Sequence, residues 1–160
     1  MKETSLAADE ALALLRENLS RLGTLSNGLA PGRLHTPPGP GTWSANDVLA
    51  HLRACADVWG GNIAKILAEE HPAFAGTNPR TWMKKTDYPE WAFEDAFRAF
   101  AAQRASLLHT LEALAPGDWE RPATVRAYGQ ANERTLRSYA SQLALHERKH
   151  VRQIEQALGA

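Results

Sequence analysis

The 160-residue sequence contains a single cysteine, Cys55, so it has no second thiol for an intramolecular disulfide. It also lacks an excess of charge, because 18 Lys and Arg residues balance 18 Asp and Glu residues. Balanced charge gives no electrostatic reason to expect binding to nucleic acid or to an anionic membrane surface. No stretch is apolar enough to cross a bilayer, and the first residues lack the apolar core and cleavage site of a signal peptide. We therefore expect a cytoplasmic protein that binds neither nucleic acid nor membrane.

The chain does contain enough apolar residues for one core, because 44% of its residues are hydrophobic and 160 residues is about the size of one domain. We predict a single domain over residues 1–160. In four segments the apolar residues recur at steps of three and four, which places them on one face of a helix. The four predicted helices cover approximately residues 5–29, 45–70, 91–114 and 136–157.

The segments between these helices are rich in proline, glycine or polar residues. Residues 35–43 carry Pro and Gly that sustain neither helix nor strand, and residues 71–88 read as irregular. No segment alternates apolar and polar residues as a strand does. Ser44 followed by Asp47 is typical of a helix N-cap. The predicted fold class is all-α, a four-helix bundle with long connections that is either antiparallel or has crossovers.

The most informative short pattern is His-Glu-x-x-His, formed by His146, Glu147 and His150 in the last predicted helix. Both histidines occupy positions where the apolar row requires Leu or Ile, and their Cβ atoms lie about 5–6 Å apart on a helix. A buried imidazole nitrogen without a partner costs roughly 1–3 kcal/mol. A divalent cation would satisfy both rings, whereas partly exposed or hydrogen-bonded histidines are the alternative interpretation.

Zinc metalloproteases share this pattern, but the rest of the sequence argues against that class. A metzincin needs Gly and His where this chain has Gln153 and Gln156. Other zincins take an acidic ligand from a later helix, and only ten residues follow His150 in the 160-residue chain. A third ligand must come from upstream, and His51 borders the apolar row of the second helix. Cys55, one turn further, is either another ligand or a small core residue.

Two further residues are weaker candidates for catalytic roles. Glu147 points about 100° away from His146 around the helix, so we expect it at the surface or supporting a ligand. Arg104 interrupts the apolar row of the third helix, and it would either hold an anionic group of a substrate or extend to the surface. The remaining histidines are expected to be solvated or to cap helices; they are His35, His71 and His109.

Two segments of the chain resemble the DinB/YfiT-like family. Residues 42–52, TWSANDVLAHL, resemble its signature Trp-Ser-x-x-(Asp/Glu)-x-(Leu/Val)-x-His-Leu. Residues 146–154, HERKHVRQI, resemble its closing His-x-x-x-His-x-x-Gln-Ile, and residues 125–139 resemble the run into its last helix. The order and spacing of these motifs agree over nearly the whole chain. The resemblance implies a four-helix bundle of unusual connectivity.

The resemblance also implies a metal centre. Three histidines of the family bind a divalent ion such as zinc or nickel, and the matching positions are His51, His146 and His150. A homodimer and small-molecule substrates are implied as well. The better understood relatives use low-molecular-weight thiols, while many others are regarded as metal-dependent hydrolases. The fold alone does not determine the reaction.

Two alternative functions follow. The chain is either an enzyme, namely a metal-dependent hydrolase or a thiol-dependent transferase or isomerase, or a non-catalytic binding or stress-response module. In the enzyme, three protein ligands leave one open position on the ion. In the module, the ion only joins the second helix to the fourth. Because metal binding needs neutral imidazoles, we expect occupancy to fall as the pH drops through about 6.5, where free histidine protonates.

Overall fold

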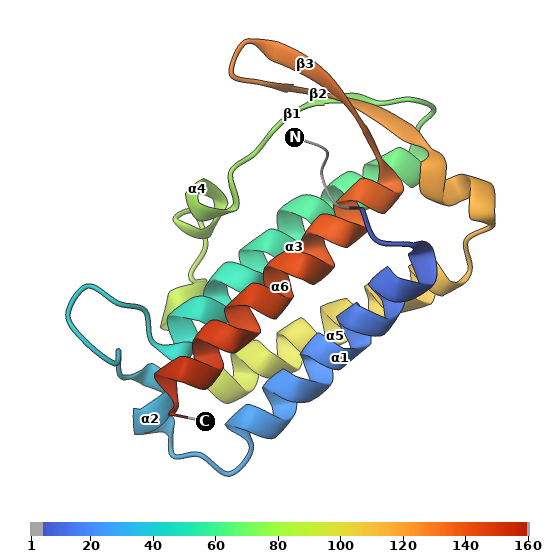
Figure 1. Cartoon of the computed structure of the whole chain (residues 1–160). Helices are drawn as coiled ribbons and strands as arrows, with labels where there is room; N and C mark the ends of the chain where they lie inside the picture. The colour runs from blue at the N-terminus through green and yellow to red at the C-terminus, as the bar shows by residue number, and fades with distance from the viewer. Residues whose placement is uncertain (1–4, 160) are drawn as a thin grey trace.

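Four long helices form the bundle, and all four were predicted. The computed structural model describes residues 5–159. The long helices are α1 (Ala8–Ser26), α3 (Ala45–Ala68), α5 (Phe93–Glu112) and α6 (Leu136–Ala157). α6 packs against both α1 and α3, and α5 packs against the same two helices (Figure 1). α1 and α3 therefore lie diagonally, as do α5 and α6. The connection from α1 to α3 crosses one end of the bundle, whereas residues 69–92, which join α3 to α5, run back along its side (Figure 1). The predicted four-helix bundle is confirmed.

A capping box determines where α3 begins. The side chain of Ser44 accepts a hydrogen bond from the backbone N–H of Asp47 at 3.1 Å, and the Asp47 carboxylate accepts one from the backbone N–H of Ser44 at 3.0 Å. Two backbone donors that a helix start leaves unpaired are thereby satisfied. The N-cap predicted from the sequence is confirmed, and it sets the position of Trp43, which directly precedes it.

A three-stranded sheet lies at one end of the bundle, contrary to the expectation that the chain has no strand (Figure 1). β1 pairs with β2 in parallel, and β2 pairs with β3 in antiparallel orientation. The strands are β1 (Ala73–Ala75), β2 (Pro122–Ala127) and β3 (Gln130–Thr135). The remaining elements are the short helices α2 (Pro31–His35) and α4 (Pro79–Met83) and the 3₁₀ helices η1 (Tyr88–Glu90) and η2 (Pro116–Glu120).

The strands were missed because they bury few side chains. In β2 only Ala123 and Val125 are buried, and no residue of β3 is buried. Strands with so little burial do not need alternating apolar and polar residues. Tyr128 and Gly129 form the turn between β2 and β3 with positive φ angles of 52° and 72°, as a two-residue type I′ turn requires. The usual sequence signal, Asn-Gly or Asp-Gly, is absent from this turn.

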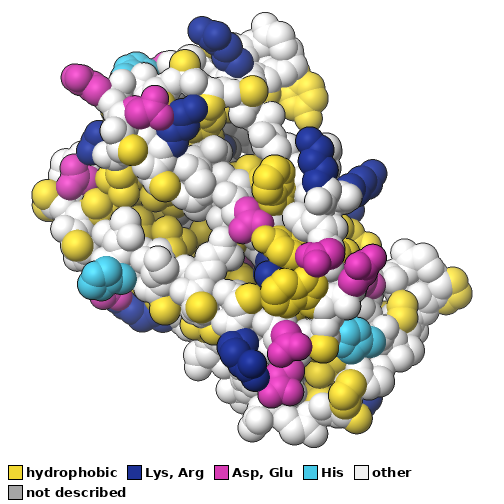
Figure 2. Space-filling model, turned by 180° about the vertical axis from the view of Figure 1, so that it is seen from behind, with side chains coloured by type: hydrophobic (Ala, Val, Ile, Leu, Met, Phe, Trp, Pro, Cys, Tyr) yellow, Lys and Arg dark blue, Asp and Glu magenta, His cyan; other side chains and the backbone are white. Residues whose placement is uncertain are grey.

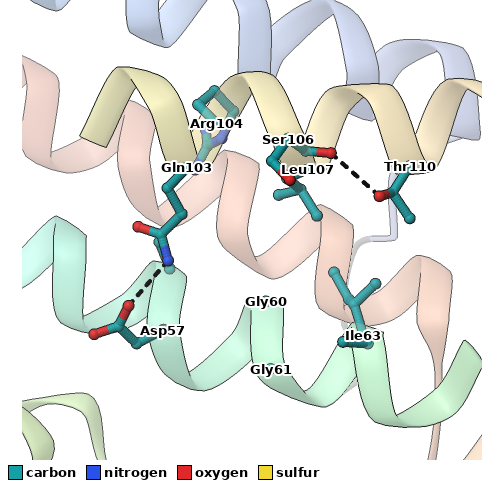
Figure 3. Close-up of a pocket in the computed structure, with 11 residues that line it drawn as sticks. Asp57, Gly60, Gly61, Ile63, Gln103, Arg104, Ser106, Leu107 and Thr110 are labelled. Carbon is teal, nitrogen blue, oxygen red and sulfur yellow. Dashed lines mark hydrogen bonds between the residues drawn. The ribbon is translucent and has the colours of Figure 1, made fainter. Parts of the chain in front are cut away.

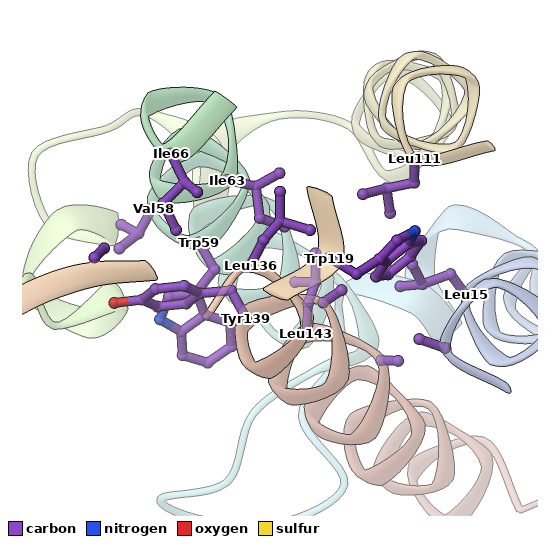
Figure 4. Packing of buried hydrophobic residues seen from close by; sticks show 14 of the residues in the cluster. Leu15, Val58, Trp59, Ile63, Ile66, Leu111, Trp119, Leu136, Tyr139 and Leu143 are labelled. Carbon is purple, nitrogen blue, oxygen red and sulfur yellow. The ribbon is translucent and has the colours of Figure 1, made fainter. Parts of the chain in front are cut away.

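The core of the bundle consists of two apolar clusters. The sheet-proximal cluster (Figure 4) includes Leu15 of α1, Trp59 of α3, Leu111 of α5 and Leu143 of α6. The sheet-distal cluster takes its members from the same helices, among them Leu22, Leu52, Phe100 and Val151. Each helix therefore contributes an apolar face to both clusters, which is the amphipathic pattern read from the sequence.

Between the two clusters lies a polar layer, to which each long helix contributes one buried residue. Its members are Asn18, His51, Arg104 and Glu147. Asn18 donates a hydrogen bond from Nδ2 to the backbone oxygen of Ala144 at 3.0 Å. Arg104 and Glu147 form a bidentate ion pair. Because α5 and α6 are diagonal, this pair crosses the centre of the bundle.

The ion pair excludes the surface position, which was one of the two positions expected for Arg104 and for Glu147. Their side chains are 1% and 0% exposed. α1 packs on one side of α6 and α3 on the other, so the buried face of α6 is wider than the row that carries the histidines. Glu147 lies on this buried face, between Ala144 and Val151. Two opposite charges are tolerated there because each satisfies the other with two hydrogen bonds.

The described part of the chain offers no helix that could cross a membrane, since none of its long helices is sufficiently apolar. On the face seen from behind, basic and acidic side chains are interspersed among hydrophobic ones (Figure 2). This face shows no field of a single charge sign, in agreement with the balanced charge of the sequence.

Loss of one partner of the buried ion pair should be costly. Arg104→Met or Glu147→Met alone leaves a buried charge unpaired and is expected to lower the free energy of unfolding by about 3–5 kcal/mol. The double variant replaces both charges with apolar side chains and should be more stable than either single variant. Urea unfolding followed by circular dichroism measures all three. If the double variant lost as much free energy of unfolding as the two single variants together, the pairing of Arg104 with Glu147 would be contradicted.

Candidate metal centre

Three histidines from two helices converge inside the bundle. His51 comes from α3, whereas His146 and His150 come from successive turns of α6. Nε2 of His146 lies 3.0 Å from Nε2 of His51 and 3.0 Å from Nε2 of His150. His51 and His150 are buried, and His146 is half-buried. The structure thus brings together the three residues that sequence reasoning selected.

Protons alone cannot satisfy this arrangement. Nδ1 of His150 lies 2.7 Å from Oε1 of Gln153, which only accepts, so the neutral ring carries its hydrogen on Nδ1 and a lone pair on Nε2. A ring nitrogen is either a donor or an acceptor. Nε2 of His146 can therefore donate to His150 or accept from His51, but it cannot do both. At most one of the two 3.0 Å contacts is a well-aligned hydrogen bond.

A cation among the three nitrogens would resolve this conflict, because each nitrogen would turn a lone pair toward it. Zinc binds histidine nitrogens at about 2.0–2.1 Å, a reach compatible with nitrogens 3.0 Å apart. Imidazole donors suit nickel as well as zinc. Gln153 would then hold the outer N–H of His150, as the partners of metal-ligating histidines commonly do. The residues present fit a divalent ion.

Burial keeps the imidazoles neutral. It lowers the pKa of His51 and the pKa of His146 to about 4, and neighbouring histidines add to the effect. Burial also lowers the pKa of His150, while the hydrogen bond to Gln153 acts in the opposite direction. Because neutral imidazole is the metal-binding form, the rings are ready for a cation at neutral pH.

Cys55 provides a further donor beside His51 and His146. Its Sγ lies 3.5 Å from Nε2 of His51, and the donor atoms of His51, Cys55 and His146 all lie within 4.8 Å of one another. Burial, together with the negative charge of Glu147, raises the pKa of the thiol well above its usual range. The thiol is therefore protonated unless a cation displaces the proton. Cys55 also belongs to the sheet-proximal cluster, so both roles expected from the sequence are compatible with its position.

Two tryptophans flank the histidines. The ring centroid of Trp43 lies 5.3 Å from that of His51. The ring of Trp59 meets that of His146 edge to face, with centroids 5.1 Å apart. Two features of the sequence could have placed them near His51. Trp43 directly precedes the N-cap of α3, and Trp59 follows His51 by two helical turns. These rings make part of the surroundings of the metal centre apolar.

The remaining predicted residues do not join the cluster. His35, His71 and His109 are exposed, which confirms their expected solvation. Nε2 of His35 accepts a hydrogen bond from the backbone N–H of Phe93 at 3.2 Å. The catalytic candidates Glu147 and Arg104 are engaged with each other and make no hydrogen bond to the three histidines.

A groove of about 440 Å³ between α3 and α5 is separate from the histidines, none of which lines it (Figure 3). Gly60 and Gly61 leave it open on the α3 side. At its edge the Asp57 carboxylate accepts a hydrogen bond from Nε2 of Gln103 at 2.9 Å. The groove is therefore a feature of the α3–α5 packing and not an extension of the metal centre.

The structure is similar to that of YfiT from Bacillus subtilis, which is described as a probable metal-dependent hydrolase with an unusual four-helix bundle topology. The TM-score is 0.74 at 16% sequence identity, and the match covers 98% of this chain and 90% of YfiT. No curated protein matches the sequence. The family model of the DinB superfamily matches residues 6–154, nearly the whole chain. The chain therefore belongs to the DinB superfamily, as its two histidine motifs had suggested.

Proposed function

We propose that this protein is a divalent-metal-dependent enzyme acting on small molecules, with zinc or nickel bound by His51, His146 and His150. One observation carries the proposal, namely the convergence of three neutral Nε2 atoms that protons cannot satisfy. The description of YfiT as a probable metal-dependent hydrolase supports it. The proposed reaction is either a hydrolysis or a thiol-dependent transfer or isomerisation. We also propose the low-molecular-weight thiol and the homodimer that the family resemblance implies.

The chain itself has three tasks in such a reaction. His51, His146 and His150 hold the ion, and an ion with three protein ligands keeps a position where it acidifies a bound water or thiol. Trp43 and Trp59 exclude water from part of the surroundings. His146 is the most accessible of the three proposed ligands, because it is half-buried whereas the other two are buried.

Glu147 does not act as a general base in this proposal. Both of its carboxylate oxygens accept hydrogen bonds from Arg104 in the polar layer. It is instead a positioning residue, because it ties the α6 turn that carries His146 to α5 on the far side of the core. A general base has to come from the substrate, from solvent or from the acidified group itself.

The position of Cys55 supports a second candidate function. Its thiol lies with the donor atoms of His51 and His146 in a group within 4.8 Å, and a thiolate there together with His150 would give the four ligands of a closed, structural zinc site. The ion would then only join α3 to α6 in a non-catalytic binding module. The proposed enzyme requires Cys55 to remain a protonated core residue, in keeping with its raised thiol pKa.

Replacement of any of the three histidines should abolish tight metal binding. His51→Ala, His146→Ala and His150→Ala are each expected to weaken zinc binding at least roughly 100-fold, because each removes one of three protein ligands. Competition with a chromophoric chelator measures the affinity, and elemental analysis the stoichiometry. His109→Ala, which changes an exposed histidine of α5, is the matched control. Unchanged affinity in a ligand variant would remove that residue from the site.

Removal of the metal should leave the bundle folded. Two apolar clusters pack without help from the ion, so chelator is expected to lower the melting temperature of the wild type without unfolding it at room temperature. His150→Ala should melt at the same temperature with and without chelator. Circular dichroism follows the transition. An unfolded apoprotein would instead favour the structural role.

The stability of the metal-free protein should fall as the pH drops from about 6.5 to about 4. In this range the histidines of the unfolded chain are protonated, while His51 and His146 stay neutral in the folded chain because their pKa is lowered to about 4. The unfolded state binds more protons, so acid favours it. Urea unfolding in chelator at about pH 7.5 and about pH 5 measures the difference. The same pH dependence in His146→Gln would contradict this cause.

A further inference from the structure

One arginine stands beside the metal centre without a carboxylate partner. Arg80 lies in the short helix α4, and its guanidinium carbon is 4.7 Å from the ring centroid of Trp43. The same ring also neighbours that of His51, at a centroid distance of 5.3 Å. A single aromatic side chain thus links the arginine to a proposed ligand of the ion. Among residues 5–159, no acidic oxygen lies within 4.0 Å of the Arg80 nitrogens.

The stacked position of Arg80 leaves its hydrogen-bond donors available. A guanidinium that lies on an aromatic ring is held by its face, while its N–H groups point outward in its plane. Arg80 is exposed, and its hydrogen bonds to the described residues involve only its backbone. It is therefore held in place by Trp43 with a free fork of donors, the form that binds a carboxylate with two parallel hydrogen bonds.

The surroundings of the three histidines are positively charged before any ion binds. The positive charge of Arg80 contributes to lowering the pKa of His51, His146 and His150, and that of Lys149 contributes for the latter two. The acidic side chain that follows His146, Glu147, is paired with Arg104. A divalent ion held by three neutral ligands keeps its full charge, so the centre lacks compensating negative charge. An anionic ligand would supply it.

The segment that carries Arg80 is anchored to α3. Oδ2 of Asp57 accepts a hydrogen bond from Nε1 of Trp82 in α4 at 3.1 Å and another from the hydroxyl of Tyr88 at 2.6 Å. Oδ1 of the same carboxylate accepts the hydrogen bond from Gln103 of α5 that Figure 3 shows. Asn78 caps α4 by accepting from the backbone N–H of Arg80 at 2.9 Å. α4 is therefore fixed relative to the helix that supplies His51.

We propose that Arg80 binds the carboxylate of a small-molecule substrate whose reacting group lies at the metal ion. This inference rests on the proposed function and names its substrate class, a small carboxylic acid. Arg80 is a specificity-determining residue in this role, because it touches the substrate at a group that does not react. A single fork of donors matches one carboxylate, and the stacking on Trp43 lowers the entropy lost on binding.

The test uses cobalt-substituted protein, in which a thiol that reaches the ion produces a sulfur-to-cobalt absorption band. 3-Mercaptopropionate and its neutral amide, 3-mercaptopropionamide, are titrated into the wild type and into Arg80→Gln. We expect the variant to weaken binding of the carboxylate ligand about tenfold more than binding of the amide, as for a charge-assisted hydrogen bond. The two ligands differ in the acidity of their thiols and in how they chelate the ion. These differences cancel when the affinity of each ligand is compared between the wild type and the variant.

Two further variants separate a directed contact from general electrostatics. Lys149→Gln removes one positive charge that acts on His146 and His150 more strongly than Arg80 does, so it is the matched control. Lys149→Gln should change the ratio of the affinities for the carboxylate and the amide ligand by less than about twofold. Arg80→Lys keeps the charge and loses the fork, so its preference for the carboxylate should lie between those of the wild type and Arg80→Gln.

The outcomes distinguish this inference from the proposed function. If cobalt binds and both thiols produce the band, but Arg80→Gln weakens both ligands equally, the role of Arg80 is wrong and the metal centre stands. Equal losses of carboxylate preference in Arg80→Gln and Lys149→Gln would likewise replace the directed contact by a general field. Failure of cobalt to bind the wild type would overturn the proposed function and, with it, the substrate class.

Discussion

Nε2 of His146 lies between those of His51 and His150, 3.0 Å from each, and no distribution of protons gives it a good partner on both sides. The rest of the site depends on this constraint. Two of the rings come from adjacent turns of α6, so they share a face automatically. The third comes from α3, which packs beside α6 because the chain crosses from α1 to the diagonal position. The unusual connectivity thereby places the two histidine-bearing helices next to each other.

The polar layer explains how polar groups are accommodated in the core of a 160-residue protein. Apolar clusters close the bundle on both sides of the layer, so the interior groups need not supply the stability themselves. Arg104 and Glu147 satisfy each other across the diagonal, and Asn18 binds the backbone of α6. The layer fixes α6 against α1 and α5 on the turn that precedes His150. His146 and His150 thus lie on a rigid helix, as a preorganised ligand set requires.

The sequence predicted those features that follow from regular spacing along a helix. The apolar rows located the four long helices, and the i, i+4 spacing located the pair on α6. His51 was found as a polar residue at the border of an apolar row. What escaped prediction depends on contacts between distant segments. The partner of Arg104 is Glu147 of α6, 43 residues further along the chain, and Arg80 lies in a segment without periodicity. The strands could not be predicted from the sequence for a similar reason, since β3 forms by pairing with β2 and buries none of its side chains.

X-ray absorption spectroscopy of the zinc-loaded protein tests the central claim most directly, because it reports the atoms around the ion without relying on activity. The account predicts three imidazole nitrogens at about 2.0–2.1 Å, seen through the multiple scattering of their rings, with one lighter oxygen or nitrogen donor and no sulfur from the protein. Fewer than three imidazoles, or a sulfur at about 2.3 Å, would contradict an open three-histidine centre.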